Sequence, residues 1–133
     1  MDYTLDLDIN TLKDTDFKKI YAQTVTDMKN LGVYKDEFIP VITRYAELRV
    51  QYIVIMGKWY ATGCEITEDY TNKAGATNAR KTALYQAVEN LRHELADHES
   101  MLGLTPQSLK KINDKNFQTS KKSSLAEALK NFD

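Results

Sequence analysis

The strongest constraint on the fold is a pair of apolar heptad patterns in two separate segments. Their apolar positions lie alternately four and three residues apart, the spacing that keeps one face of an α-helix apolar. Two such faces joined by a polar segment predict a long antiparallel helical hairpin. The first pattern is Val41, Tyr45, Leu48, Tyr52, Ile55 and Trp59, and the second is Leu84, Val88, Leu91, Leu95, His98 and Leu102.

Signals for helix starts and stops predict an all-α chain with an N-terminal helix, the hairpin, a short C-terminal helix and a flexible tail. Gly32 and Gly103 stand where helix-ending glycines belong, and Pro106 suits the first turn of a new helix. Val50 to Met56 could also form a strand, but the heptad spacing on both sides favours helix. We expect one helical domain over 14–113, with helices at 14–31, 36–61, 78–102 and 106–113 and a polar loop at 62–76.

The two ends of the chain differ in charge although the net charge is only −1. Residues 1–16 hold five aspartates and one lysine, whereas residues 105–133 hold six lysines and three acidic residues. Residues 1–13 alternate apolar and acidic side chains, which would suit a strand, but no partner strand is evident nearby. We expect an acidic flexible arm over 1–13 and a basic flexible tail over 114–133.

The apolar surface of the segment 36–61 is wider than one helical stripe. Phe38, Ile42, Ile53, Met56 and Tyr60 extend it beyond the heptad positions, so this helix must bury two sides. A chain of this size has little left to cover the second side, and we therefore expect a homo-oligomer. Its interface is predicted at Tyr45, Leu48, Tyr52, Ile55, Trp59, Leu84, Val88, Leu91 and Leu95.

Residue sets for catalysis, metal binding or membrane insertion are not found in the sequence. His93 and His98 are five residues apart, which turns them about 140° from each other on a helix, so they do not share one metal ion. No Gly-Lys-Ser/Thr phosphate loop occurs, and the apolar run between Arg49 and Lys58 is too short for a membrane span. We expect no enzyme activity, no cofactor, no metal and no membrane partner.

A helix, a glycine-containing turn and a second helix begin the predicted domain. This order is typical of a helix-turn-helix, but an ordinary corner between two helices has the same order and is commoner. If it binds DNA, the candidate residues are Lys18, Lys19, Lys29 and Arg44. The rival basic set lies near the C-terminus and comprises Lys110, Lys111, Lys115, Lys121 and Lys122.

The most specific motif is the run Leu102-Gly103-Leu104-Thr105-Pro106-x-Ser108, which follows the second heptad pattern. A helix ending in this run resembles the C-terminal signature of short, all-helical phage terminase small subunits. The resemblance covers roughly residues 35–112, with Gly103, Leu104, Thr105 and Pro106 as the family motif.

The resemblance implies a DNA-packaging accessory in the host cytoplasm. Such a protein binds double-stranded viral DNA, assembles into a ring and delivers the DNA to the large terminase subunit, which carries the ATPase and nuclease. It also implies that the tail from residue 115 onward docks on that subunit. Without the resemblance, the residues would suit a coiled-coil adaptor or scaffold that binds only protein equally well.

Overall fold

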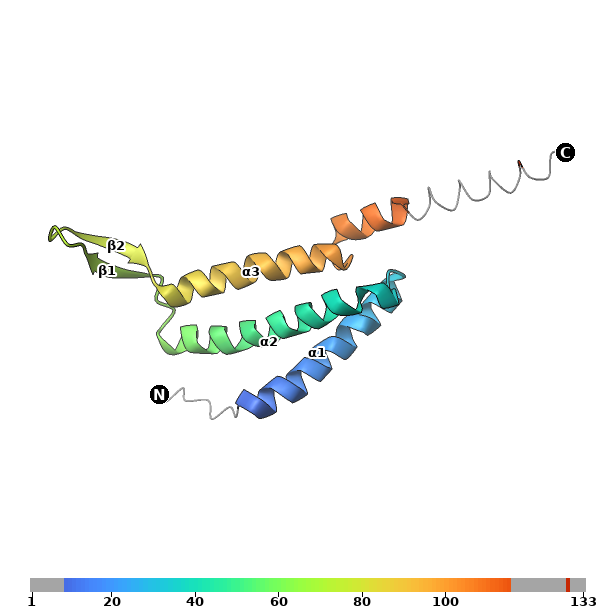
Figure 1. Ribbon diagram of the computed structural model, residues 1–133, viewed down its shortest axis with the longest axis horizontal. Helices are drawn as coiled ribbons and strands as arrows, with labels where there is room; N and C mark the ends of the chain where they lie inside the picture. The colour runs from blue at the N-terminus through green and yellow to red at the C-terminus, as the bar shows by residue number, and fades with distance from the viewer. Residues whose placement is uncertain (1–8, 116–128, 130–133) are drawn as a thin grey trace.

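The computed structural model describes residues 9–115 and residue 129. Helix α2 lies between α1 and α3, and α2 and α3 run antiparallel side by side (Figure 1). The fold is therefore mostly helical, as predicted, with a small two-stranded sheet that was not. In chain order the elements are α1 (Ile9–Leu31), the 3-10 turn η1 (Asp36–Phe38), α2 (Ile39–Ala61), β1 (Thr67–Thr71), β2 (Thr77–Lys81) and α3 (Ala83–Met101), and residues 106–115 are again helical.

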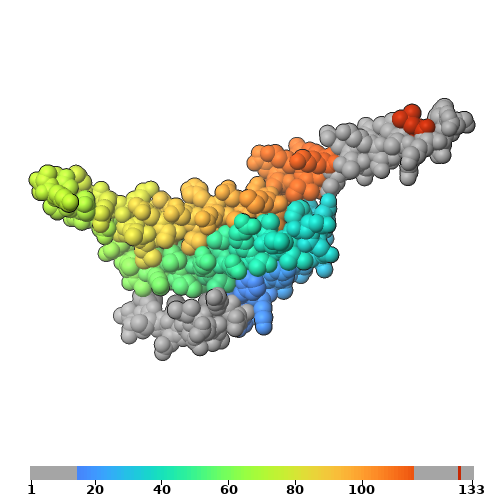
Figure 2. Space-filling view, viewed as in Figure 1, coloured from blue at the N-terminus to red at the C-terminus, as the bar shows by residue number. Residues whose placement is uncertain are grey.

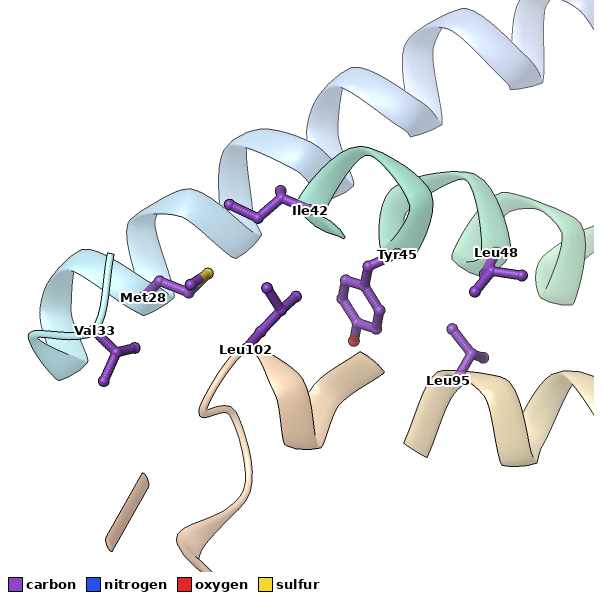
Figure 3. Packing of buried hydrophobic residues seen from close by; sticks show 7 residues of the cluster. All are labelled: Met28, Val33, Ile42, Tyr45, Leu48, Leu95 and Leu102. Carbon is purple, nitrogen blue, oxygen red and sulfur yellow. The ribbon is translucent and has the colours of Figure 1, made fainter. Parts of the chain in front are cut away.

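The core sits at one end of the molecule, where the α1–α2 turn meets the end of α3 (Figure 3). The first half of α2 contributes to it from two sides, with Ile42 near α1 and Leu48 near α3. Apolar side chains from these three segments bury one another and supply most of the packing free energy. The buried cluster comprises Met28, Val33, Ile42, Tyr45, Leu48, Leu95 and Leu102.

Helix α1 answers the question of what covers the second side of α2. It packs along the first half of α2, and its Thr24 and Met28 side chains are buried. The wide apolar surface around Ile42 is therefore satisfied within one subunit. The width of this apolar surface therefore does not by itself require a second subunit.

The predicted loop over 62–76 is wrong in part, because a β-hairpin occupies residues 67–81. Strand β1 pairs antiparallel with β2, from Thr67 opposite Lys81 to Thr71 opposite Thr77. The Asn72 side chain accepts hydrogen bonds from the Ala74 and Ala76 amides and so closes the turn. All ten strand residues are exposed, so the strands lack the alternation of apolar and polar residues by which strands are recognised. The hairpin projects from the helical body (Figure 2).

Three helix starts also differ from the prediction, and the first is that of α2, which begins at Ile39 after the 3-10 turn η1 rather than at residue 36. Helix α3 begins at Ala83 rather than residue 78, because the hydroxyl of Thr82 accepts a hydrogen bond from the Tyr85 amide and caps the helix. Helix α1 begins at Ile9 rather than residue 14, so residues 9–13 of the predicted flexible arm are helical. Residues 50–56 are helical throughout. Residues 1–8 of the predicted arm, and 116–133 of the predicted tail apart from residue 129, lie outside the described residues.

Candidate nucleic-acid and subunit interfaces

The four cations predicted to contact DNA are all exposed, but they do not form one cluster. Lys18 and Lys29 are eleven residues apart on α1, which places them on the same flank of the helix and about 16 Å apart along its axis. The Lys29 ammonium lies 5.0 Å from the centre of the Tyr34 ring. Lys19 lines a different hollow, between α1 and α2, and Arg44 stands on α2. Only Lys18 and Lys29 therefore share a surface on one rigid element.

The hollow beside Lys19 contains a polar chain that links α2 to α3. Its volume is about 560 Å³, and Tyr45 and Arg49 line its α2 side. The Tyr45 hydroxyl donates to Glu99 Oε1 at 3.1 Å and accepts from Arg49 Nη1 at 3.0 Å. Burial raises the pKa of the Tyr45 phenol, Arg49 lowers it and Glu99 raises it further. The phenol therefore keeps its proton and positions the Arg49 guanidinium at the surface.

A second tyrosine holds a second arginine on the same side of the hairpin. Arg92 Nε donates to the Tyr52 hydroxyl at 3.2 Å, and its guanidinium lies 5.9 Å from the Trp59 ring. The Trp59 ring in turn lies 5.6 Å from that of Tyr85. We call this side, with Arg49 and Arg92 held by Tyr45 and Tyr52, the arginine flank. The sequence did not reveal it, because Tyr52 and Arg92 are 40 residues apart and meet only through the register of α2 on α3.

The opposite side of the hairpin carries an apolar hollow of about 990 Å³. The carboxylates of Glu47 and Glu94 and the amides of Gln51 and Asn90 also line it. We call it the carboxylate hollow. Its apolar lining comes from all three helices and comprises Phe17, Val50, Val54, Ile55, Ala87 and Leu91.

The nine residues predicted for the subunit interface separate into two groups. Tyr45, Leu48, Val88 and Leu95 are buried within the subunit and form its own core. The other five keep part of their surface exposed: Tyr52, Ile55, Trp59, Leu84 and Leu91. Of these, Ile55 and Leu91 line the carboxylate hollow, while Tyr52 and Trp59 belong to the arginine flank. Only this second group can contribute to contact with another chain.

The family motif has a structural role at the end of α3. Gly103 adopts a left-handed conformation with φ +73°, and a Cβ there would approach Ile112 Cδ1 to 2.9 Å. The Leu104 amide donates to the Glu99 carbonyl at 2.9 Å, the long bond of a Schellman stop. Thr105 and Ser108 then cap the next helix reciprocally. The Thr105 amide donates to the Ser108 hydroxyl, and the Ser108 amide donates to the Thr105 hydroxyl. The motif therefore turns the chain back onto the core.

The histidines are placed as the spacing predicts, with His93 exposed and His98 buried. His98 Nδ1 donates to the Glu94 carbonyl at 2.7 Å, while its Nε2 is buried without a hydrogen-bond partner. Over the described ranges, no group of three His, Cys, Asp or Glu side chains could hold a metal ion. None of the helices described here is both long and apolar enough to span a bilayer.

The fold and its surfaces define a small helical protein built around an α2/α3 hairpin, with charged and apolar patches open to partners. The profile of the family described as phage terminase, small subunit, matches residues 18–118. The chain belongs to this family and hence to the machinery that packages phage DNA. Neither the curated proteins nor the solved structures include a match to it.

Proposed function

We propose that this terminase small subunit binds double-stranded viral DNA, assembles into a ring and delivers the DNA to the large terminase subunit in the host cytoplasm. The family match over residues 18–118 carries the proposal. In the ring, the arginine flank and the carboxylate hollow would be available for contact between copies. The tail over 115–133 is the proposed docking segment for the large subunit.

For DNA contact we propose Lys18, Lys19, Lys29 and Arg44, with Lys18 and Lys29 as the central pair. Both lysines are exposed on one flank of a rigid helix, at a spacing of about 16 Å. Each subunit offers only a few phosphate contacts, so a single copy should bind weakly. A ring repeats the pair in every copy, and avidity then raises the affinity of the assembly.

Charge reversal at Lys18 and Lys29 together tests this assignment. Binding of double-stranded DNA should weaken, and the slope of log K against log salt should fall by about 0.9 for every phosphate that a subunit no longer neutralises. Fluorescence anisotropy titrations at several salt concentrations measure both quantities. Lys58→Glu is the matched control, because Lys58 is also exposed but belongs to neither candidate set.

The rival assignment places DNA on the helical residues 106–115, where Lys110 and Lys111 are exposed. If DNA binding survives reversal at Lys18 and Lys29 but disappears after reversal at Lys110 and Lys111, the C-terminal set is the DNA-binding element and the assignment to α1 is wrong.

A further inference from the structure

The unpaired charges of the arginine flank and of the carboxylate hollow are of opposite sign. Among the described residues, neither Arg49 nor Arg92 pairs with a carboxylate, and neither Glu47 nor Glu94 pairs with a cation. The other acidic groups near the arginine flank are engaged: Glu99 accepts from Tyr45, and Glu89 binds Lys81. The free charges are thus cationic on the arginine flank and anionic in the lining of the carboxylate hollow.

Helix geometry places these charges on opposite sides at the same height. Arg49 is two residues from Glu47, and Arg92 is two residues from Glu94. Residues two apart on an α-helix point about 200° away from each other but differ by only about 3 Å along the axis. A copy shifted sideways without sliding along the hairpin would therefore bring its guanidinium groups level with the carboxylates of its neighbour.

From this arrangement we propose that the carboxylate hollow of one copy receives the arginine flank of the next. Arg92 faces the neighbour's Glu94, Arg49 faces the neighbour's Glu47, and the partly exposed rings of Tyr52 and Trp59 cover the apolar lining. This inference rests on the proposed ring and names the contact that builds it. Because the two surfaces are different patches of one chain, the contact is heterologous, the type that builds a ring when the rotation from copy to copy closes.

The chemistry of both surfaces suits this occupant. Tyrosine, tryptophan and arginine are the residues that most often anchor protein interfaces, and here they are already held in place by hydrogen bonds within the subunit. The hollow offers an apolar floor with carboxylates beside it, and a guanidinium matches a carboxylate with two parallel hydrogen bonds. Opposite charges also fix the register of the contact and oppose the two-fold arrangement that would bring flank against flank.

Charge exchange tests the contact. Glu94→Arg alone and Arg92→Glu alone should each raise the concentration at which the assembly dissociates by about tenfold or more, because each sets like charges against each other. The chain with both substitutions should assemble as the parent does. An equimolar mixture of the two single variants should also regain assembly, since each repulsive surface finds its complement on the other variant. Sedimentation velocity over a dilution series measures these outcomes.

Asp97→Arg is the matched control, because Asp97 is exposed on α3 outside the hollow and should leave assembly unchanged. Circular dichroism verifies the folding of every variant. If Arg92→Glu does not fold, Arg49→Glu with Glu47→Arg gives the same test at the neighbouring pair. A parent that is monomeric would contradict the ring itself. A parent that assembles, with single variants that assemble equally well, would overturn only the contact proposed here.

Discussion

At the scale of single residues, Gly103 shows why the family motif contains a glycine. Its left-handed backbone would strain any other L-residue, and the space for a side chain is already taken by Ile112 and Val33. Gly32 has a similar backbone with φ +75°, but an added Cβ there would meet nothing within 4 Å. The two glycines therefore separate backbone strain from steric exclusion.

We expect Gly103→Ala to lower the free energy of unfolding by about 2–3 kcal/mol, because strain and overpacking act together. Gly32→Ala should cost only about 1 kcal/mol, the strain alone. Urea denaturation of both variants measures the difference. Equal destabilisation at the two positions would show that the contact with Ile112 relaxes freely.

At the scale of elements, the β-hairpin is held to the helices at its base. The Lys81 ammonium binds both carboxylate oxygens of Glu89, at 3.0 and 3.2 Å. The Trp59 indole donates to the Glu65 carbonyl, and the Thr82 hydroxyl donates to the same carbonyl. A two-stranded hairpin is marginally stable by itself in water, so these contacts fix how it projects.

Glu89→Gln should increase hydrogen exchange in the hairpin amides, because it removes the ion pair with Lys81. The pair lowers the pKa of Glu89 and raises that of Lys81. The ion pair therefore stabilises the β-hairpin at pH values between the pKa of Glu89 and that of Lys81. This stabilisation is lost as the pH falls through the pKa of Glu89 or rises through that of Lys81. Parent and variant should differ at neutral pH and converge in acid. A difference that persists in acid would assign the protection to other contacts.

The same elements show what a single sequence can and cannot predict. The heptads predicted α2 and α3, because each buries one continuous apolar stripe. The sequence pattern did not predict the β-hairpin, because Tyr70 is the one large apolar residue of its strands and both of its faces are exposed. The arginine flank depends on which tyrosine of α2 lies beside which residue of α3. That register is set by side-chain packing between α2 and α3, and the periodicity of each helix by itself does not predict it.

At the scale of the whole molecule, the core occupies one end and the β-hairpin projects from the other (Figure 1). The α2 helix packs against both α1 and α3, and Phe17 of α1 reaches the carboxylate hollow beside Val54 and Ile55. Three of the predicted interface residues, Tyr45, Leu48 and Leu95, belong to the core cluster at this end of the molecule.

The single tryptophan gives the molecule an optical probe of its own. Trp59 is half-buried beside Tyr85 and Arg92, so a neighbour seated on the arginine flank would remove water from the indole. When the protein is diluted until the assembly dissociates, the fluorescence emission of Trp59 should therefore move to longer wavelength. No added label is needed. The Glu94→Arg variant should begin that shift at a higher protein concentration than the parent. An emission wavelength that does not change on dilution would mean that Trp59 lies away from the contact.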